Sequence, residues 1–198
     1  MRAEPRPRTG PTAPGGGLVF RAWRAEDAEA ALALYGGDGG GRGLSPRVGS
    51  VPDLAAMRLL LAGWIAEGGS LESPAGRWAV QRVADGRVVG GAALLPLPPG
   101  GEDWEVDWLP EPGARDTAGC VGSLAAWAFG HGVTEVFSVV RLAGRGVASA
   151  EDAADDVVGD VVGDRDGMGW VGETGKYFGQ GTRVFRLRPG DLDPTARG

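Results

Sequence analysis

The segment from Trp104 to Gly130 reads WEVDWLPEPGARDTAGCVGSLAAWAFG and is the most informative part of the chain about its architecture. It opens with Trp104 to Leu109, where aromatic and β-branched residues are typical of a strand. A turn rich in proline and glycine follows from Pro110 to Gly119. Apolar side chains then recur at helical spacing from Cys120 to Phe129, and a glycine ends the pattern. A strand, a glycine-bearing turn and a helix in this order indicate an α/β domain with this unit at its centre.

Residue patterns on both sides of this unit predict further strands and two more helices. Asp53 stands where a helix N-cap is expected, and Ala84-Asp85-Gly86 is typical of a hairpin turn between two strands. A weaker helical pattern covers Ala148 to Val158. The predicted strands are Leu18 to Arg21, Arg77 to Val83, Arg87 to Leu95, Glu135 to Val140, Met168 to Gly172 and Thr182 to Leu187, and the helices are Ala25 to Tyr35 and Val51 to Glu67. This order predicts a mixed sheet with helices on its faces.

The length of 198 residues suits one domain. Met1 to Gly17 is rich in Pro, Gly and Arg and is predicted to be a disordered leader. We expect a single domain from Leu18 to Leu192 and a short tail from Asp193 to Gly198.

Charge and cysteine content narrow the class of protein. The net charge of −6 disfavours a nucleic-acid partner and mildly favours a cationic acceptor. Cys120 is the single cysteine and His131 the single histidine, so neither an intrachain disulfide nor a His/Cys zinc site is available. Cys120 itself is expected to be a small buried residue. No apolar run approaches the roughly 20 residues of a membrane span. We therefore expect a cytoplasmic protein with no membrane partner and no metal.

Several local motifs, in this order, resemble the GNAT superfamily, the GCN5-related N-acetyltransferases. They lie at Phe20 to Ala28, Arg77 to Val80, Glu105 to Leu109, Gly167 to Thr174 and Phe185 to Leu192. The nearest type acetylates ribosomal-protein N-termini and small amines. The resemblance implies an α/β fold with a mixed, mostly antiparallel sheet flanked by helices. It also implies that the central fourth and fifth strands splay apart and hold acetyl-CoA between them.

The resemblance further implies which residues bind acetyl-CoA as co-substrate. On the strand these are Val106, Trp108 and Leu109, and on the turn they are Arg115, Asp116, Thr117, Ala118 and Gly119. Backbone N–H groups of the turn and the positive end of the helix dipole suit a pyrophosphate. Asp116 departs from the pattern because the family usually has glycine there. A carboxylate about 4 Å from a phosphate costs roughly 1 kcal/mol in water and about 4 kcal/mol at an effective dielectric near 20. The chain also has no asparagine, a residue that the family commonly places before its last strands.

The same resemblance implies catalytic roles. A backbone N–H of Val106 or Asp107 would polarise the thioester carbonyl, and Glu105 would be the base. We take Glu105 and Asp107 to lie on opposite faces of the strand, so that only one faces the cleft. Tyr177 would act as the acid or line the acceptor site, whereas Tyr35 is expected in the core. Trp104 and Trp170 are expected in the core, with the acceptor cleft as the alternative position.

These patterns favour one function and leave two alternatives open. The first is an N-acetyltransferase that transfers the acetyl group directly to a small-molecule amine or a protein N-terminus, and a homodimer is an assembly that the resemblance implies. The second is a binding or structural module of the same fold that has lost acetyl-CoA, which Asp116 favours. The third is an acyltransferase for a longer acyl-CoA, because Gly90, Gly91 and Ala92 would widen a pocket.

Overall fold

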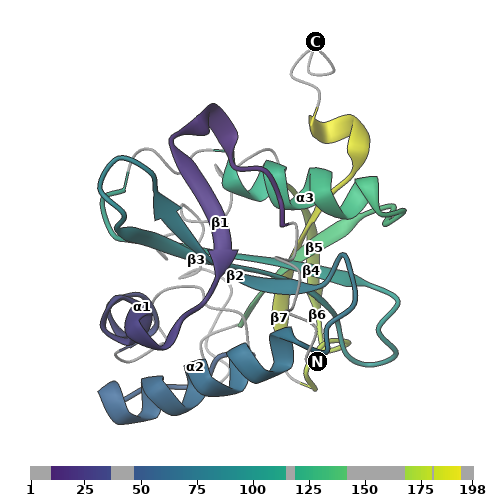
Figure 1. Cartoon of the computed structure of the whole chain (residues 1–198). Helices are drawn as coiled ribbons and strands as arrows, with labels where there is room; N and C mark the ends of the chain where they lie inside the picture. Colours follow the sequence, from purple (N-terminus) through teal and green to yellow (C-terminus); the bar gives the residue numbers. More distant parts are fainter. Residues whose placement is uncertain (1–9, 37–46, 115–118, 142–167, 180, 193–198) are drawn as a thin grey trace, which may run out of the picture.

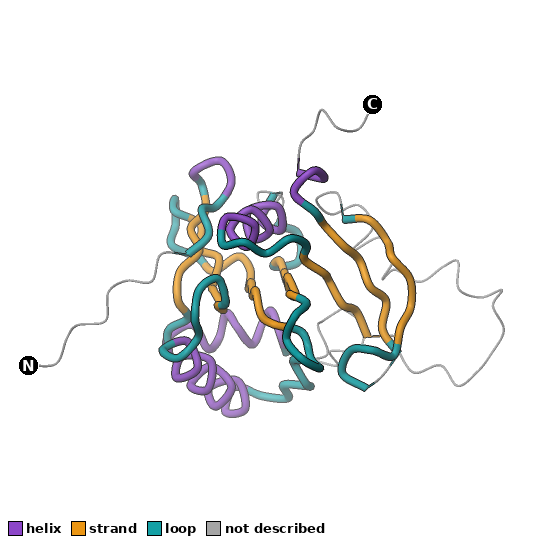
Figure 2. The backbone as a smooth tube through the Cα atoms, turned by 90° about the vertical axis from the view of Figure 1, so that its right-hand side faces the viewer, coloured by secondary structure: helices purple, strands orange, loops and turns teal. Residues whose placement is uncertain are grey.

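The computed structural model describes residues 10–36, 47–114, 119–141, 168–179 and 181–192. Within these residues, seven strands form one sheet in the order β1-β2-β3-β4-β5-β7-β6. Helices α1 and α2 cover one face of the sheet and α3 covers the other (Figures 1 and 2). The elements are β1 (Leu18–Ala22), α1 (Ala28–Tyr35), α2 (Leu54–Gly68), β2 (Gly76–Arg82), β3 (Val88–Pro96), β4 (Trp104–Pro110), α3 (Cys120–Gly130), β5 (Val136–Arg141), β6 (Gly169–Thr174) and β7 (Thr182–Leu187), with short 3-10 turns at Pro14–Gly16, Ala25–Asp27 and Pro189–Leu192.

The sheet is antiparallel except between β4 and β5. Each residue of β4 pairs with β3, from Trp104 to Pro110. Among the described residues, β4 and β5 pair in parallel at Trp104 with Val136 and at Glu105 with Phe137, and at no other position. The two central strands therefore separate after Glu105, as the sequence resemblance implied.

The order of strands and helices from β1 to β7 confirms the sequence prediction. The second helix begins at Leu54 and not at Val51, because the Asp53 carboxylate accepts a hydrogen bond from the N–H of Ala56 at 2.8 Å and caps the helix there. The predicted helix from Ala148 to Val158 lies outside the described residues.

The structure describes part of the segment predicted to be a disordered leader, residues 10–17. Residues 1–9 lie outside the described residues, but the chain follows a defined path from Gly10 onward. Ala13 packs against the main apolar cluster, and a short turn forms at Pro14–Gly16. Apolar contacts of this segment with the core thus outweigh its disorder-prone composition.

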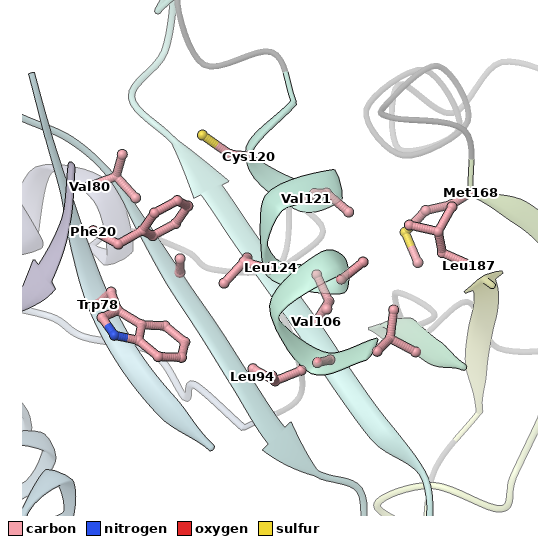
Figure 3. Close-up of a cluster of buried hydrophobic side chains, with 14 of the residues drawn as sticks. Phe20, Trp78, Val80, Leu94, Val106, Cys120, Val121, Leu124, Met168 and Leu187 are labelled. Atoms are coloured by element: carbon pink, nitrogen blue, oxygen red, sulfur yellow. The ribbon is translucent and has the colours of Figure 1, made fainter. Parts of the chain in front are cut away.

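Two apolar clusters fill the two faces of the sheet. The cluster under α3 includes Val106, Leu124 and Leu187 (Figure 3). The cluster under α1 and α2 includes the aromatic rings of Trp23, Tyr35 and Trp64.

Cys120 is fully buried, as predicted, and so is Tyr35. Trp170, however, is 68% exposed on β6, so its predicted place in the core is wrong. The strand β6 is one of the two edge strands of the described sheet. None of the described helices is both long and apolar enough to cross a membrane.

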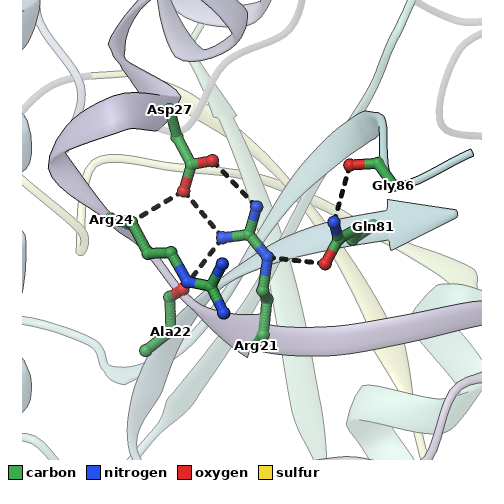
Figure 4. Close-up of polar contacts among 6 residues, drawn as sticks. All are labelled: Arg21, Ala22, Arg24, Asp27, Gln81 and Gly86. Carbon is green, nitrogen blue, oxygen red and sulfur yellow. Dashed lines mark hydrogen bonds and ion pairs between the residues drawn. The ribbon is translucent and has the colours of Figure 1, made fainter. Parts of the chain in front are cut away.

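A polar network ties β1 to the start of α1 (Figure 4). The Arg21 guanidinium donates two hydrogen bonds to the Asp27 carboxylate, at 2.7 and 2.8 Å, and a third to Gln81 of β2 at 2.8 Å. Burial of Asp27 works against its ionisation, but the bonds from Arg21 and from the Arg24 N–H hold the pKa of this carboxyl below its usual range. The network fixes where α1 begins relative to the sheet.

Gly91 of β3 is required by the ring of Tyr35. A β-carbon at this position would lie 2.0 Å from the Tyr35 hydroxyl oxygen and 2.8 Å from the ring carbon that carries it. The ring has little room to move, because it packs on Trp23 and Trp64 at centroid distances of 6.3 and 5.2 Å. We expect Gly91→Ala to lower the free energy of unfolding by about 1–3 kcal/mol.

Urea denaturation measures this loss, and Gly63→Ala is the matched control. Gly63 lies inside α2, where an added β-carbon would meet nothing within 4 Å. The control should stabilise the protein by about 0.5–1 kcal/mol through helix propensity. Equal effects of the two alanines would show that Tyr35 does not need the space at Gly91.

Candidate active site

Three carboxylates alternate along β4 and the residue that precedes it. Side chains two residues apart in a strand point to the same side, about 7 Å from one another. Asp103, Glu105 and Asp107 therefore share one face, and Leu109 on that face packs into the cluster under α1 and α2. Val106 faces the other way, into the cluster under α3. The prediction that Glu105 and Asp107 lie on opposite faces is wrong, because it misapplied this two-residue period.

Glu105 is held in a buried ion pair. Its side chain is 2% exposed, and Oε2 lies 2.5 Å from Nε of Arg47. The same guanidinium donates through Nη2 to the carbonyl of Pro96 and lies 5.3 Å from the centroid of the Phe178 ring. The negative charge of Glu105 is thus compensated by a cation that two other segments, at Pro96 and Phe178, help to hold in place.

The Asp103 carboxylate is bound by two side chains of the turn between β6 and β7. Its carboxylate lies 2.5 Å from Nζ of Lys176 and accepts a hydrogen bond from the Tyr177 hydroxyl at 2.9 Å. The bond from Lys176, assisted by that from Tyr177 and opposed by burial, lowers the pKa of Asp103. Tyr177 is buried against Phe137, and burial together with its bond to Asp103 raises the pKa of Tyr177 above the ordinary value. The hydroxyl of Tyr177 therefore keeps its proton at neutral pH.

Asp107 differs from the other two carboxylates. Burial first, and then the charge of Glu105, raise its pKa from the ordinary 3.8 to about 7. The positive charges of Arg77 and Arg47 and the backbone of Trp108 oppose this rise without cancelling it. Asp107 is therefore the carboxyl group of this face that gains or loses a proton near neutral pH, as a general base requires.

Arg77 and an aromatic wall border Asp107. Nε of Arg77 lies 2.9 Å from a carboxylate oxygen of Glu67, and its guanidinium lies 5.2 Å from the centroid of the Trp64 ring. Burial, and then the charge of Asp107, raise the pKa of Tyr35 well above its ordinary value. Tyr35 therefore stays neutral, and Arg77 supplies a fixed positive charge beside Asp107.

The backbone of β4 has two distinct sides. The N–H of Glu111 donates to the carbonyl of Val89 at 2.7 Å, and the N–H of Leu97 donates to the carbonyl of Asp103 at 2.7 Å. Since hydrogen-bonded pairs alternate along an antiparallel ladder, the odd-numbered residues of β4 bond to β3. Val106 and Trp108 consequently turn their backbone groups toward β5, beyond the last β4–β5 pair. Of the two expected donors to the thioester, Val106 thus has this orientation, whereas Asp107 and also Leu109 face β3.

The expected phosphate-binding turn is described only at its end. Arg115, Asp116, Thr117 and Ala118 lie outside the described residues, and their roles stay predictions. Gly119 is the N-cap of α3 with φ 83°, a left-handed conformation that glycine adopts without strain. Among the described residues, no group of three or more His, Cys, Asp or Glu side chains is arranged to hold a metal.

Gly90 and Gly91 do not widen a pocket for a longer acyl chain. A β-carbon on Gly90 would lie 2.4 Å from the Trp108 ring, and one on Gly91 would meet the Tyr35 hydroxyl. The space that the missing side chains leave is filled by these aromatic rings. The observation that favoured a longer acyl-CoA therefore no longer supports it.

Sequence reasoning placed Glu105, Val106, Trp108 and Tyr177 near this site but missed Arg47 and Arg77. The alternation of acids at Asp103, Glu105 and Asp107 was a readable signal for a shared strand face. Arg77 of β2 is paired with Ala93 of β3, which is paired with Asp107 of β4, so the two-residue period of the strands places Arg77 and Asp107 on the same face of the sheet. Arg47 carries no such signal, because it lies outside any periodic element.

Comparisons with known proteins bear on the fold. No protein-family model and no curated protein sequence matches the chain. Solved structures do match. One is a probable GNAT-family acetyltransferase from Chromobacterium violaceum, with 19% identity, 96% of this chain and 100% of the other covered, and a TM-score of 0.54. Another is the Salmonella typhimurium acetyltransferase that modifies the N-terminal serine of ribosomal protein L7/L12, with 12% identity, coverage of 88% and 96%, and a TM-score of 0.55. A third is the microcin C7 self-immunity acetyltransferase, solved with acetyl-CoA and AMP, with 8% identity, coverage of 88% and 93%, and a TM-score of 0.56.

Proposed function

We propose that this chain, which has the fold of the GNAT acetyltransferases, is an acetyl-CoA-dependent N-acetyltransferase. It would transfer the acetyl group to a primary amine by direct attack, without a covalent enzyme intermediate. One observation carries the proposal. The separation of β4 from β5 after Glu105 lies directly beside Asp107, a carboxyl group with a pKa of about 7. A backbone donor and a proton acceptor thus come from neighbouring residues of one strand.

The roles of the residues follow from this arrangement. Asp107, as carboxylate, accepts a proton from the acceptor amine, and the amine nitrogen attacks the thioester carbonyl carbon. The N–H of Val106 donates to the carbonyl oxygen as negative charge develops there. The carbon–sulfur bond then breaks, and the thiolate takes a proton. Tyr177 is a proton donor for this last step if its hydroxyl leaves Asp103, and Glu105 takes part as the charged neighbour of Asp107.

Binding of acetyl-CoA is proposed for the residues that the family pattern marks. These are Val106 and Trp108, whose backbone groups face β5, and the turn Arg115, Asp116, Thr117, Ala118 and Gly119. Leu109 is left out, because its backbone faces β3 and its side chain packs under α1 and α2. The solved neighbour with acetyl-CoA supports this co-substrate. The acceptor is a small-molecule amine or a protein N-terminus; the neighbour that modifies an N-terminal serine supports the second class. We also propose a cytoplasmic protein that forms a homodimer.

Isothermal titration with acetyl-CoA tests the proposal first. We expect micromolar to millimolar binding and a rise in melting temperature with acetyl-CoA. A thiol-release assay with a panel of small amines and short peptides with free N-termini then tests transfer. The absence of both heat and a thermal shift at millimolar acetyl-CoA would sink the proposal.

A second candidate is a binding module of this fold that has lost acetyl-CoA. Asp116 favours it, since a carboxylate at this point of the turn would repel a pyrophosphate. This candidate predicts that wild type binds CoA hardly at all and that Asp116→Gly raises the affinity at least tenfold. Micromolar binding by the wild type excludes it.

A further inference from the structure

We propose that Arg47 is a positioning residue that keeps Glu105 ionised and so leaves Asp107 as the carboxyl group that takes up the proton. The inference rests on the proposed function for its catalytic consequence. The protonation states that we infer for Glu105 and Asp107 are properties of the protein without substrate.

The contacts of Arg47 fix its guanidinium over Glu105. Nε lies 2.5 Å from Oε2 of Glu105, Nη2 donates to the Pro96 carbonyl, and the plane lies 5.3 Å from the centroid of the Phe178 ring. Arg47 itself is only 20% exposed. A guanidinium serves several acceptors in a fixed fork, whereas the ammonium of lysine is a point charge. The β3–β4 connection and the β6–β7 turn thus both help to hold the cation that Glu105 needs.

Two carboxylates about 7 Å apart on a partly buried strand face do not ionise independently. The one with the closer cation ionises first, and its charge then opposes ionisation of the other. Glu105 has Arg47 in direct contact. No direct ion pair of Asp107 is found among the described residues, although the charges of Arg77 and Arg47 lie near enough to act on it. The proton shared by this pair therefore resides on Asp107.

The charged and titratable groups around Asp107 come from four parts of the fold. Glu105 lies on the same strand, Arg77 on β2, Tyr35 on α1 and Arg47 before α2. Tyr35 does not account for a transition near pH 7, because burial raises its pKa above the ordinary value. Arg77 acts on Asp107 as a positive charge that lowers the pKa of this carboxyl. The further carboxylate of the face, Asp103, is neutralised by Lys176. Glu105 and its cation Arg47 are thus the groups that set where Asp107 titrates.

Carboxyl-carbon NMR titration of the full chain tests this division directly, without any substrate. In wild type we expect a midpoint of about 7 for Asp107 and an ionised Glu105 throughout pH 5–9. Glu105→Gln should lower the Asp107 midpoint by about one pH unit or more, because it removes the neighbouring charge. Arg47→Gln should bring the titration of Glu105 into the measured range and lower the Asp107 midpoint by about half a unit or more, because a protonated Glu105 no longer opposes ionisation of Asp107, and this outweighs the lost attraction of Arg47. Arg47→Lys should fall between wild type and Arg47→Gln.

Arg82→Gln is the control, because it removes an arginine that pairs with Asp85 at a hairpin turn away from this face. It should leave both midpoints unchanged. If Arg47→Gln does not fold, Glu105→Gln and Arg47→Lys still decide the matter. An Asp107 midpoint that stays within about 0.3 units in both of these folded variants would overturn the inference.

The pH profile of kcat/KM separates this inference from the proposed function. Its acidic limb should move with the NMR midpoint in each variant. Midpoints that move as stated in a protein without acetyl transfer would refute the proposed function and support the division of protons. If the protein transfers acetyl groups but the acidic limb of its kcat/KM profile is the same in wild type and in the Arg47 and Glu105 variants, the inference is overturned and the proposed function is retained.

Discussion

An Asp107→Asn variant should transfer acetyl groups about 10²–10⁴ times more slowly than wild type at pH 8, the usual contribution of a general base. Asparagine has nearly the shape of aspartate but accepts no proton at neutral pH. The loss should appear in kcat, because the substitution removes a proton acceptor and leaves the backbone of Val106 and Trp108 in place. A thiol-release assay at saturating acetyl-CoA measures it.

Glu111→Gln is the matched control for this loss. Glu111 follows the same strand and pairs with Arg87 at the surface, at 2.6 Å. This variant should keep its activity within about twofold, as expected for a surface ion pair. If Asp107→Asn loses less than tenfold while Glu105→Gln loses more than a hundredfold, then Glu105 is the base and our assignment of the proton to Asp107 is wrong.

The same Asp107→Asn substitution should stabilise the protein at alkaline pH. Below about pH 4 the Asp107 carboxyl is protonated in both the folded and the unfolded chain, so its ionisation does not change the free energy of unfolding. Between about pH 4 and 7 the unfolded chain releases this proton while the folded chain keeps it, so stability falls as pH rises, and the loss is complete above pH 7. Asparagine has no such loss. We expect a gain of about 1–3 kcal/mol at pH 8 and a smaller gain at pH 5, measured by urea unfolding.

The order of the strands and helices was predictable because each element carries its own period. Leu54 to Gly68 shows helical spacing behind the N-cap Asp53, and Ala84-Asp85-Gly86 marks its hairpin turn. The splay of β4 from β5 has no such local signal. It depends on which strands pair across a long stretch of chain, and the family resemblance supplied it.

The site was predictable only in part, because some of its residues follow a local strand pattern and others reach it through long-range contacts. Glu105 was chosen from its strand, but a glutamate alone does not tell whether a cation covers it. Arg47 lies 58 residues away in sequence and reaches Glu105 only after the chain has folded. The pKa of Asp107 depends on that distant contact and on burial, so no local pattern contains it.

The other large effect concerns α3, because this helix joins the two halves of the sheet. Among the residues that the structure describes, β4 and β5 form two residue pairs, Trp104 with Val136 and Glu105 with Phe137. Leu124 of α3 is fully buried in one cluster with Val106 of β4 (Figure 3). The same cluster contains Val136 of β5. Apolar packing therefore replaces the hydrogen bonds that the separated strands do not make.

Leu124→Ala should lower the free energy of unfolding by about 3–5 kcal/mol, the range for a fully buried leucine that leaves a cavity. Leu59→Ala is the matched control, since Leu59 is 77% exposed on α2 and its loss should change stability by no more than about 0.5 kcal/mol. Urea unfolding followed by tryptophan fluorescence measures both variants. Because α3 holds β4 against β5 at the point where they part, binding of acetyl-CoA should weaken together with stability. A loss below about 1 kcal/mol in Leu124→Ala would mean that the two halves of the sheet are held together by other contacts, and that the splay does not depend on α3.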